Sequence, residues 1–135
     1  MTPAARLDAL TGRWRTLRAI RQADGAWLRF EGETVWRPEG DFVRCTEVGT
    51  LRQGARSFPA SRETLWRAAG DAIDIRFADG RPFHRLDALG LAWHDCSPDT
   101  YRLRYDFSAW PVWSVRWHVT GPRKDYRALT RYRRA

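Results

Sequence analysis

Cysteine, lysine, methionine and long apolar runs are all scarce in this sequence of 135 residues. Its two cysteines, Cys45 and Cys96, cannot build a disulfide framework, and we expect both to be reduced thiols. No apolar run approaches the roughly 20 residues that a membrane helix needs, and residues 1–10 lack the apolar stretch of a signal peptide. These absences exclude disulfide-rich scaffolds and predict no membrane span and a cytoplasmic location.

Positive charge is abundant and comes almost wholly from arginine. The chain has 24 Lys+Arg against 16 Asp+Glu, a net charge of +8, and Lys124 is its only lysine. Arginine binds phosphate and carboxylate groups in a bidentate manner better than lysine does, although a GC-rich genome produces the same bias without a functional cause. The charge therefore permits a nucleic acid or an acidic partner without requiring one.

The pattern of short alternating segments predicts the fold class. We expect one β-barrel domain over residues 1–135, in which residues 1–11 form a short helical lead-in with Thr2 capping a helix over Pro3–Leu10. Turn signals of Gly, Pro and Asp separate the remaining segments, which predicts about ten antiparallel strands. These strands are Arg13–Arg21, Ala26–Arg37, Asp41–Leu51, Ser61–Ala69, Ala72–Ala78, Arg81–Asp87, Leu91–Cys96, Thr100–Phe107, Val112–Thr120 and Asp125–Arg133.

The expected architecture is all-β, an antiparallel up-and-down barrel, because closure removes exposed strand edges. Alternation with a period of two residues assigns side chains to the two faces of each strand. Arg18 and Glu47 fall on inward sets, and so do all the tyrosines. The other inward residues of interest are Trp14, Trp36, Cys45, Thr64, Trp66, Ile75, Trp113 and Trp117.

Three turns predict the register of the central strands. The Asp79-Gly80 hairpin would pair Ile75 with His84 and Phe77 with Pro82. A loop over 88–90 would then pair His84 with His94, and a turn over 97–100 would pair Cys96 with Tyr101 and His94 with Leu103. This register gathers His84, His94, Cys96 and Tyr101 on the inner face, and a slip of one residue in the middle loop would undo it.

Several blocks of sequence carry a family resemblance. They are Gly12-x-Trp14, Asp79-Gly80-Arg81-Pro82-Phe83-His84, His94-Asp95-Cys96 with Asp99 and Tyr101, and Gly121-Pro122-Arg123-Lys124-Asp125-Tyr126. With them the chain resembles, over essentially its whole length, a family of small bacterial proteins, domain of unknown function family 6314, which implies no activity. The Gly-x-Trp pair also resembles the lipocalin or calycin class, which implies a tryptophan plug at one barrel end and a cavity for an apolar or amphipathic ligand.

Arg18 and Glu47 are the first candidate site. Unpaired charges inside a small barrel are costly, so the two side chains are expected to pair. One interpretation is a purely structural ion pair; the other is an anchor for an anionic ligand, completed by tyrosine hydroxyl groups. An interior of this composition is also similar to that of the barrel-shaped phenolic acid decarboxylases, which act on a carboxylate without a cofactor.

His84, His94 and Cys96 are the second candidate site. Histidine and cysteine are ligands for zinc and other transition metals, and the i, i+2 spacing places His94 and Cys96 on one face. The spacing matches no established metal signature, and histidines on a half-apolar face are usually hydrogen-bonded core residues. We therefore predict no metal and no cofactor here.

The outward arginines are the third candidate site. The residues are Arg13, Arg15, Arg102, Arg104, Arg116, Arg127, Arg131 and Arg133, with His118 among them. They lie on the first strand and the late strands, which become neighbours when the barrel closes. A solvated face is the plain interpretation, and a wall for RNA, anionic lipid or an acidic partner is the functional one. No aromatic stacking platform is interleaved with these arginines, which argues against single-strand binding.

The sequence thus favours a protein that binds a small anionic or aromatic amphipathic molecule in its barrel. The alternatives are a cofactor-free lyase or isomerase using the same cavity, and a binder of nucleic acid or acidic protein through the outer arginines; a homodimer is a further option. The predicted ligand contacts are Arg18, Trp36, Glu47, Trp66, His84, His94, Cys96, Tyr101, Trp117, Tyr126 and Tyr132.

Overall fold

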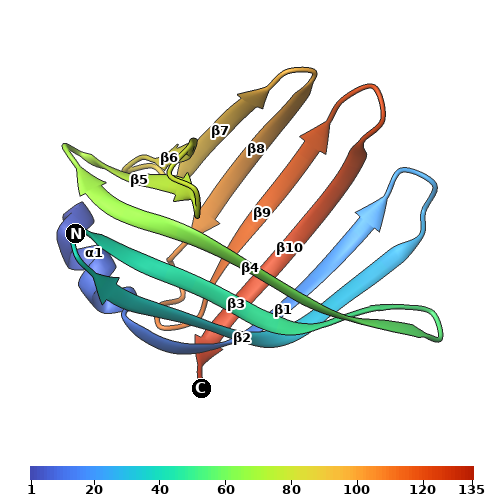
Figure 1. The fold of residues 1–135 in the computed structure, drawn as a ribbon, viewed down its shortest axis with the longest axis horizontal. Helices are drawn as coiled ribbons and strands as arrows, with labels where there is room; N and C mark the ends of the chain where they lie inside the picture. The colour runs from blue at the N-terminus through green and yellow to red at the C-terminus, as the bar shows by residue number, and fades with distance from the viewer.

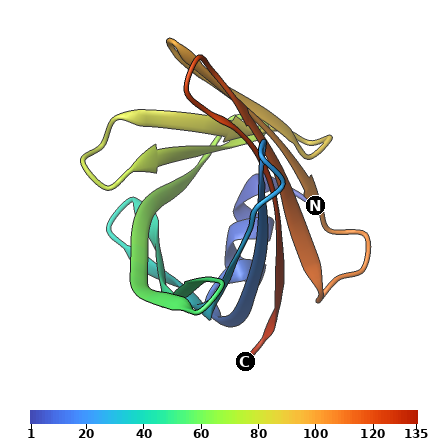
Figure 2. The same cartoon turned by 90° about the vertical axis from the view of Figure 1, so that its right-hand side faces the viewer.

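A computed structural model describes residues 1–135 as one helix and ten strands. These are α1 (Pro3–Leu10), β1 (Gly12–Gln22), β2 (Trp27–Glu39), β3 (Phe42–Gln53), β4 (Arg56–Ala69), β5 (Ala72–Phe77), β6 (Pro82–Leu86), β7 (Leu91–Cys96), β8 (Asp99–Asp106), β9 (Trp113–Thr120) and β10 (Asp125–Arg134). All strands belong to one sheet in the order β6-β5-β4-β3-β2-β1-β10-β9-β8-β7, and the sheet curls into a nearly closed barrel (Figures 1 and 2). The predicted all-β barrel with a short N-terminal helix is confirmed.

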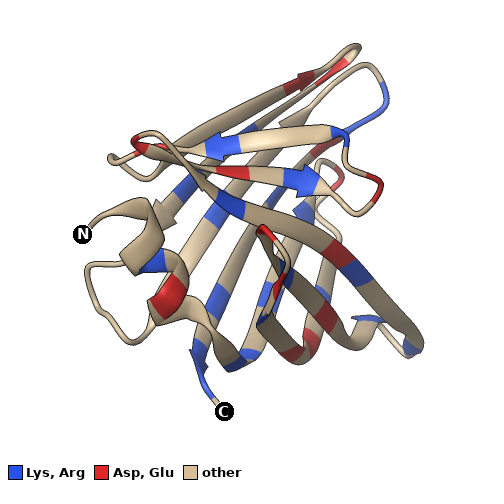
Figure 3. Cartoon of the chain, turned by 60° about the vertical axis from the view of Figure 1, so that its left-hand side comes forward, with Lys and Arg blue, Asp and Glu red and all other residues tan.

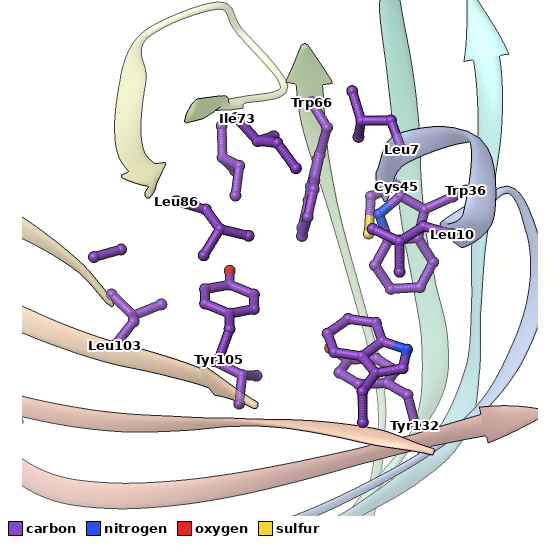
Figure 4. Close-up of a cluster of buried hydrophobic side chains, with 14 of the residues drawn as sticks. Leu7, Leu10, Trp36, Cys45, Trp66, Ile73, Leu86, Leu103, Tyr105 and Tyr132 are labelled. Carbon is purple, nitrogen blue, oxygen red and sulfur yellow. The ribbon is translucent and has the colours of Figure 1, made fainter. Parts of the chain in front are cut away.

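Helix α1 covers one end of the barrel. The Thr2 hydroxyl accepts a hydrogen bond from the Ala5 amide at 3.1 Å, and a proline in the first turn suits a helix start because its missing N–H would be unpaired there anyway. Leu7 and Leu10 are buried against the barrel core, and Figure 4 shows them beside Trp36. The Trp14 indole donates to the Leu10 carbonyl at 2.8 Å, so this tryptophan fills the end of the barrel below the helix. The helix is too short and too polar to cross a membrane.

Strand β1 joins the early and late parts of the chain. It pairs along nearly its whole length with β2 on one side and with β10 on the other. Its burial alternates as predicted, with Trp14, Thr16 and Arg18 buried and the residues between them exposed. The predicted inward residues of the other strands are likewise buried or half-buried, except Pro82 and Cys96, which are exposed.

Strand β4 begins earlier than the sequence predicts. The sequence predicts a strand over Ser61–Ala69, yet β3 and β4 pair from Gln53↔Arg56 onward, including Thr50↔Pro59. The other edge of β4 pairs with β5 only from Thr64 onward. Proline lacks a backbone N–H, and on this unpaired stretch of edge no ladder bond is lost.

Two hairpins shift the predicted register, the first by one residue and the second by two. Ile75 pairs with His84 as predicted, but a bulge follows and Arg76, not Phe77, lies opposite Pro82. The turn between β7 and β8 is two residues shorter than expected, so His94 pairs with Tyr101 and Cys96 with Asp99. Because this second shift equals two residues, His94 and Tyr101 stay on the inner face, whereas Cys96, at the end of β7, is exposed.

The barrel has a seam between β6 and β7. These strands end the sheet order on opposite sides, and no ladder joins them. The predicted pairing of His84 with His94 is therefore wrong, although both side chains face the interior. Phe83 packs at the seam, with its ring centroid 5.4 Å from that of His94 and 4.5 Å from that of Phe77. Aromatic packing closes the interior here in place of backbone hydrogen bonds.

A pair of glycines gives the inner wall its space for large side chains. Gly32 of β2 and Gly49 of β3 lie directly opposite each other. A Cβ atom on either would come within 3 Å of the Phe30 ring and would overlap a backbone carbonyl oxygen. The Phe30 ring therefore occupies the volume that two side chains would take, and the Arg18 guanidinium lies 5.2 Å from its centroid.

We predict that Gly49→Ala destabilises the fold by about 1–3 kcal/mol, because the new methyl group must displace backbone or the Phe30 ring. The free energy of unfolding, measured in urea, reports this change. Ser61→Ala on the neighbouring strand is exposed and is the matched control, with an expected change within about 0.5 kcal/mol. Equal stability of the two variants would contradict the assigned role of the glycine pair.

Candidate functional site

A buried ion pair crosses the inner face from β1 to β3. Arg18 donates two hydrogen bonds to the Glu47 carboxylate, at 2.6 and 3.0 Å, and its Nε donates to the Thr130 hydroxyl at 2.7 Å. Both charged side chains are at least nine-tenths buried. Bidentate geometry and a third polar partner satisfy the guanidinium in a place where an unpaired charge would be costly. The structure forms the pair that the sequence predicts.

Arg62 of β4 supplies a second positive charge to the same carboxylate. Its Nε lies 3.1 Å from a Glu47 oxygen, and its side chain is 42% exposed. The guanidinium also lies 5.0 Å from the ring of Trp117 on β9, so Arg62 spans the interior from β3 to β9. The cluster of Arg18, Glu47 and Arg62 therefore carries a net positive charge, and Arg62 is its solvent-accessible member.

The two arginines keep Glu47 ionised. Burial by itself would raise the pKa of this carboxyl group, but the hydrogen bonds from Arg18 and the charges of Arg62 and Arg18 outweigh it, and the pKa is lowered. Burial raises the pKa of Tyr132, which lies beside the cluster, to about 12. At neutral pH the cluster therefore contains one carboxylate, two guanidinium groups and a protonated phenol.

A small hollow of about 30 Å³ opens beside this cluster. Its lining residues are Cys45, Glu47, Arg62, Thr64, Ile75, Phe83, His84, Trp117 and Tyr132. Two of these carry buried nitrogen atoms without a hydrogen-bond partner in the protein, His84 Nδ1 and Trp117 Nε1. Buried polar groups are nearly always hydrogen-bonded, so these two nitrogens mark the hollow as a place where an additional polar group would be stabilised.

His84 is a neutral group in this hollow. Its Nε2 is 2.8 Å from the Tyr105 hydroxyl, and its side chain is buried. Burial lowers the pKa of His84 to about 3, with the charges of Arg62 and His94 adding to the effect. Burial raises the pKa of Tyr105 well above its ordinary value. The imidazole of His84 and the phenol of Tyr105 are therefore both neutral and share one hydrogen bond.

The structure separates the predicted ligand contacts into three groups. Glu47, His84, Trp117 and Tyr132 line the hollow, and Arg18 holds Glu47. Trp36 and Trp66 instead pack edge-to-face, with centroids 5.5 Å apart, in the core that includes Leu7 and Leu10 of α1. The third group does not line the hollow: His94, Tyr101 and Tyr126 are half-buried, and Cys96 is exposed at the end of β7.

The histidines and Cys96 do not come together. His84 and His94 lie on strands that do not pair, and Cys96 lies opposite Asp99 at the hairpin end of β7. No group of three or more His, Cys, Asp or Glu side chains in the chain is arranged to hold a metal ion. Cys96 is exposed at the end of β7, beside the two-residue turn to β8.

Arg62 is the functional residue that the sequence reasoning missed. It shares the inward face with Thr64 and Trp66 two and four residues later, so extending that set by one step would have found it. In the predicted strand Ser61–Ala69, Arg62 is the second residue, and residues at the end of a strand are less firmly assigned to a face. The signal was present in the alternation, and the ladder with β3 extends it back to Arg56.

Comparisons with known proteins agree with this fold. A family of unknown function, DUF6314, matches residues 10–134. The chain is similar to the S-type phycobiliprotein lyase CPES from Guillardia theta, with a TM-score of 0.65, 9% sequence identity, and coverage of 100% of this chain and 93% of that chain. At this identity the likeness shows the fold alone. A search of curated protein sequences finds no match.

We predict that Glu47→Gln destabilises the protein by about 3–5 kcal/mol, since it leaves Arg18 buried without a carboxylate. Arg62→Gln leaves Glu47 paired with Arg18 and is expected to cost less than about 1 kcal/mol. Urea unfolding of both variants tests this order. Glu63→Gln, which removes a carboxylate from the exposed Arg44 pair, is the control; a Glu47→Gln loss no larger than this control would show that the pair is not structural.

The pKa of His84 predicts a pH dependence of stability. Between pH 6.5 and 4.5 the unfolded chain takes up a proton at His84, whereas the folded chain does not until about pH 3. The free energy of unfolding therefore falls as pH is lowered through this interval, by about 2 kcal/mol from this group. Glu47 adds to the loss near and below its ordinary pKa of 4.5, where the unfolded-state carboxyl group takes up a proton while the folded-state carboxylate, whose pKa is lowered, stays ionised.

His84→Gln removes this contribution, so its stability should change less between pH 6.5 and 4.5 than that of the parent protein. Urea unfolding at several pH values measures both curves. Parallel curves would contradict the neutral, buried state of His84.

Proposed function

This chain belongs to DUF6314, a family of unknown function, and we propose that it binds a small anionic or aromatic amphipathic molecule inside its barrel. The observation that carries the proposal is the half-exposed Arg62, which faces the hollow beside two unpartnered nitrogen atoms. In this assignment Arg62 takes the anionic group of the ligand, and Glu47 and Arg18 hold the site in shape.

The charge of the cluster supports an anionic ligand. Two guanidinium groups share one carboxylate, so an incoming carboxylate, sulfonate or phosphate brings the interior closer to neutrality. Each of the three nitrogen atoms of Arg18 already donates a hydrogen bond, to Glu47 or Thr130. Arg62 makes one ion-pair contact and is therefore the cation with donors left for a ligand.

The surroundings of the cluster support an amphipathic ligand. Ile75 and Phe83 line the hollow on one side. Toward the hairpin end of the barrel, Ile20 and Leu28 are paired neighbours on the inner face and remain half-buried. An apolar or aromatic body against these side chains would place its acidic group near Arg62, while His84 Nδ1 and Trp117 Nε1 supply polar contacts.

Binding requires the interior to open. The hollow of about 30 Å³ holds no more than a water-sized group, and pockets for small molecules have volumes of about 300–1,000 Å³. The Arg62 side chain, lying over Trp117, is the part that must move. It comes from the half of β4 that pairs on one edge only, which makes its displacement less costly than that of a residue inside a two-sided ladder.

The same geometry favours binding over the alternative of proton-transfer catalysis. Efficient general acid–base groups have pKa values near the working pH. In this cluster Glu47 has a lowered pKa, the pKa of His84 is about 3 and that of Tyr132 is about 12. The structural neighbour is named a lyase, so a related fold serves an enzyme in that protein, but these protonation states support a binding role here.

We predict that an anionic aromatic probe, 8-anilinonaphthalene-1-sulfonate, binds the interior and that Arg62→Gln weakens its binding about tenfold or more. The reason is the loss of a charge-assisted hydrogen bond, worth about 1.5–3 kcal/mol. Energy transfer from tryptophan to the probe measures the dissociation constant. The uncharged analogue N-phenyl-1-naphthylamine should lose little affinity in the same variant.

Arg116→Gln removes the same charge from the outer face and is the matched control. Weakening by Arg116→Gln with no effect of Arg62→Gln would assign the probe to the outer surface and overturn the proposal. Native mass spectrometry of the freshly purified protein adds a direct observation, because a retained ligand would appear as added mass that Arg62→Gln reduces.

A further inference from the structure

A row of directly paired residues runs across the outer face of six strands. In order it contains Trp93 of β7, Arg102 of β8, His118 of β9, Arg127 of β10, Arg21 of β1 and Trp27 of β2. Adjacent strands lie about 4.8 Å apart, so the row is about 24 Å long. We call these residues the outer row. Figure 3, with lysine and arginine in blue, shows cationic residues recurring along several strands of the sheet.

A broad hollow of about 530 Å³ adjoins the outer row. Ala19 and Leu129, paired neighbours on β1 and β10, contribute small and apolar side chains to it. Its arginines are Arg21, Arg102, Arg104, Arg116 and Arg127. The hollow combines apolar side chains with five arginines on the outside of the barrel, and Trp117 is the one lining residue that it shares with the interior hollow.

The arginines around this hollow are free of carboxylate partners. None of the five takes part in an ion pair of the chain, whereas Arg13, Arg44, Arg67, Arg76 and Arg81 elsewhere do. Asp106 lies near Arg104 and Arg116, but its carboxylate accepts hydrogen bonds from Ser108. His118 lies 3.5 Å from Asp125. Like charges gathered in this way repel, so the arrangement favours a bound polyanion.

Exposed tryptophans stand at both ends of the outer row. Trp93 is 67% exposed and Trp27 is 51% exposed. The Arg21 guanidinium lies 5.7 Å from the Trp27 ring. Within each strand no aromatic side chain alternates with these arginines, so the sequence shows no stacking platform; Trp27 and Trp93 lie on the strands that pair with β1 and β8. The pairing of β2 with β1 and of β7 with β8 puts them beside the arginines, which corrects that conclusion.

We propose that the outer row binds single-stranded nucleic acid, with phosphates on the arginines and unstacked bases on Trp27 and Trp93. Cationic grooves with aromatic side chains on which bases stack are the general solution for single strands, with sites of about 4–16 nucleotides. A duplex keeps its bases stacked inside and offers no face to the tryptophans. An acidic peptide offers charge without the flat rings that would use them.

The test uses a fluorescein-labelled oligouridylate of twelve nucleotides and fluorescence anisotropy at several salt concentrations. If three to five phosphates are neutralised, the logarithm of the binding constant should fall with the logarithm of salt with a slope of about −2 to −4. The double variant Arg116→Ser, Arg127→Ser should weaken binding at least tenfold and reduce the slope by about 1 to 1.5.

A charge-matched control separates this site from the general basicity of the chain. Arg37→Ser with Arg56→Ser removes two exposed arginines outside the hollow. Its affinity should stay within about threefold of the parent protein. Equal weakening by the two double variants would mean non-specific attraction and would overturn the proposal.

Substitution of the two tryptophans tests whether the surface prefers a single-stranded nucleic acid to other polyanions. Trp27→Ala and Trp93→Ala should each weaken oligouridylate binding about tenfold, and exposed Phe58→Ala should not. Circular dichroism confirms that each variant is folded. Undetectable binding at 50 mM salt, unchanged affinity in both tryptophan variants, or tighter binding of polyglutamate or phosphatidylserine vesicles at equal charge concentration would each overturn the proposal.

Discussion

The buried pair of Arg18 and Glu47 is the constraint on which the inner structure depends. Two charges removed from water must be paired and fully hydrogen-bonded, or the barrel loses several kcal/mol. The requirement extends beyond the pair, because Arg18 and Glu47 lie on strands separated by β2. The Phe30 ring of β2 lies over Gly32 and Gly49, with its centroid 5.2 Å from the Arg18 guanidinium. The glycines, the Phe30 ring and Thr130 belong to one arrangement that keeps a charged pair satisfied inside a small barrel.

The period of a β-strand divides the charge of this protein between two surfaces. Arg18 and Arg21 lie three residues apart on β1, so one points inward to Glu47 and the other outward to the row that includes Arg127. Inside the barrel, a buried cation has lost its hydration, so it must be paired with an anion. Outside, cations are solvated and accumulate without partners. The same residue type therefore stabilises the interior and creates an unpaired cationic surface outside.

The faces of the strands could be predicted from sequence because they depend only on alternation, which survived a register error of two residues at the β7–β8 turn. That is why Arg18, Glu47, His84 and Tyr132 were correctly placed inside. The extent of β4 could not be predicted, since a proline is tolerated only where an edge is unpaired, and that is a property of the finished sheet. The seam between β6 and β7 and the meeting of Trp27 and Trp93 with the arginines likewise depend on the order of strands.

The two ends of the barrel have different freedom, and this determines where function can be separated from stability. At the α1 end, Trp14, Trp36 and Trp113 are almost wholly buried, so any change there opens a cavity in the core. Glu47 is similarly restricted, because its loss strands a buried guanidinium. Arg62 alone in the cluster contacts both the buried carboxylate and solvent, from a stretch of strand with one free edge. Substitution of Arg62 can therefore change the affinity for a ligand while the fold persists. The effect of such a substitution on binding is the clearest indicator of a site inside this barrel.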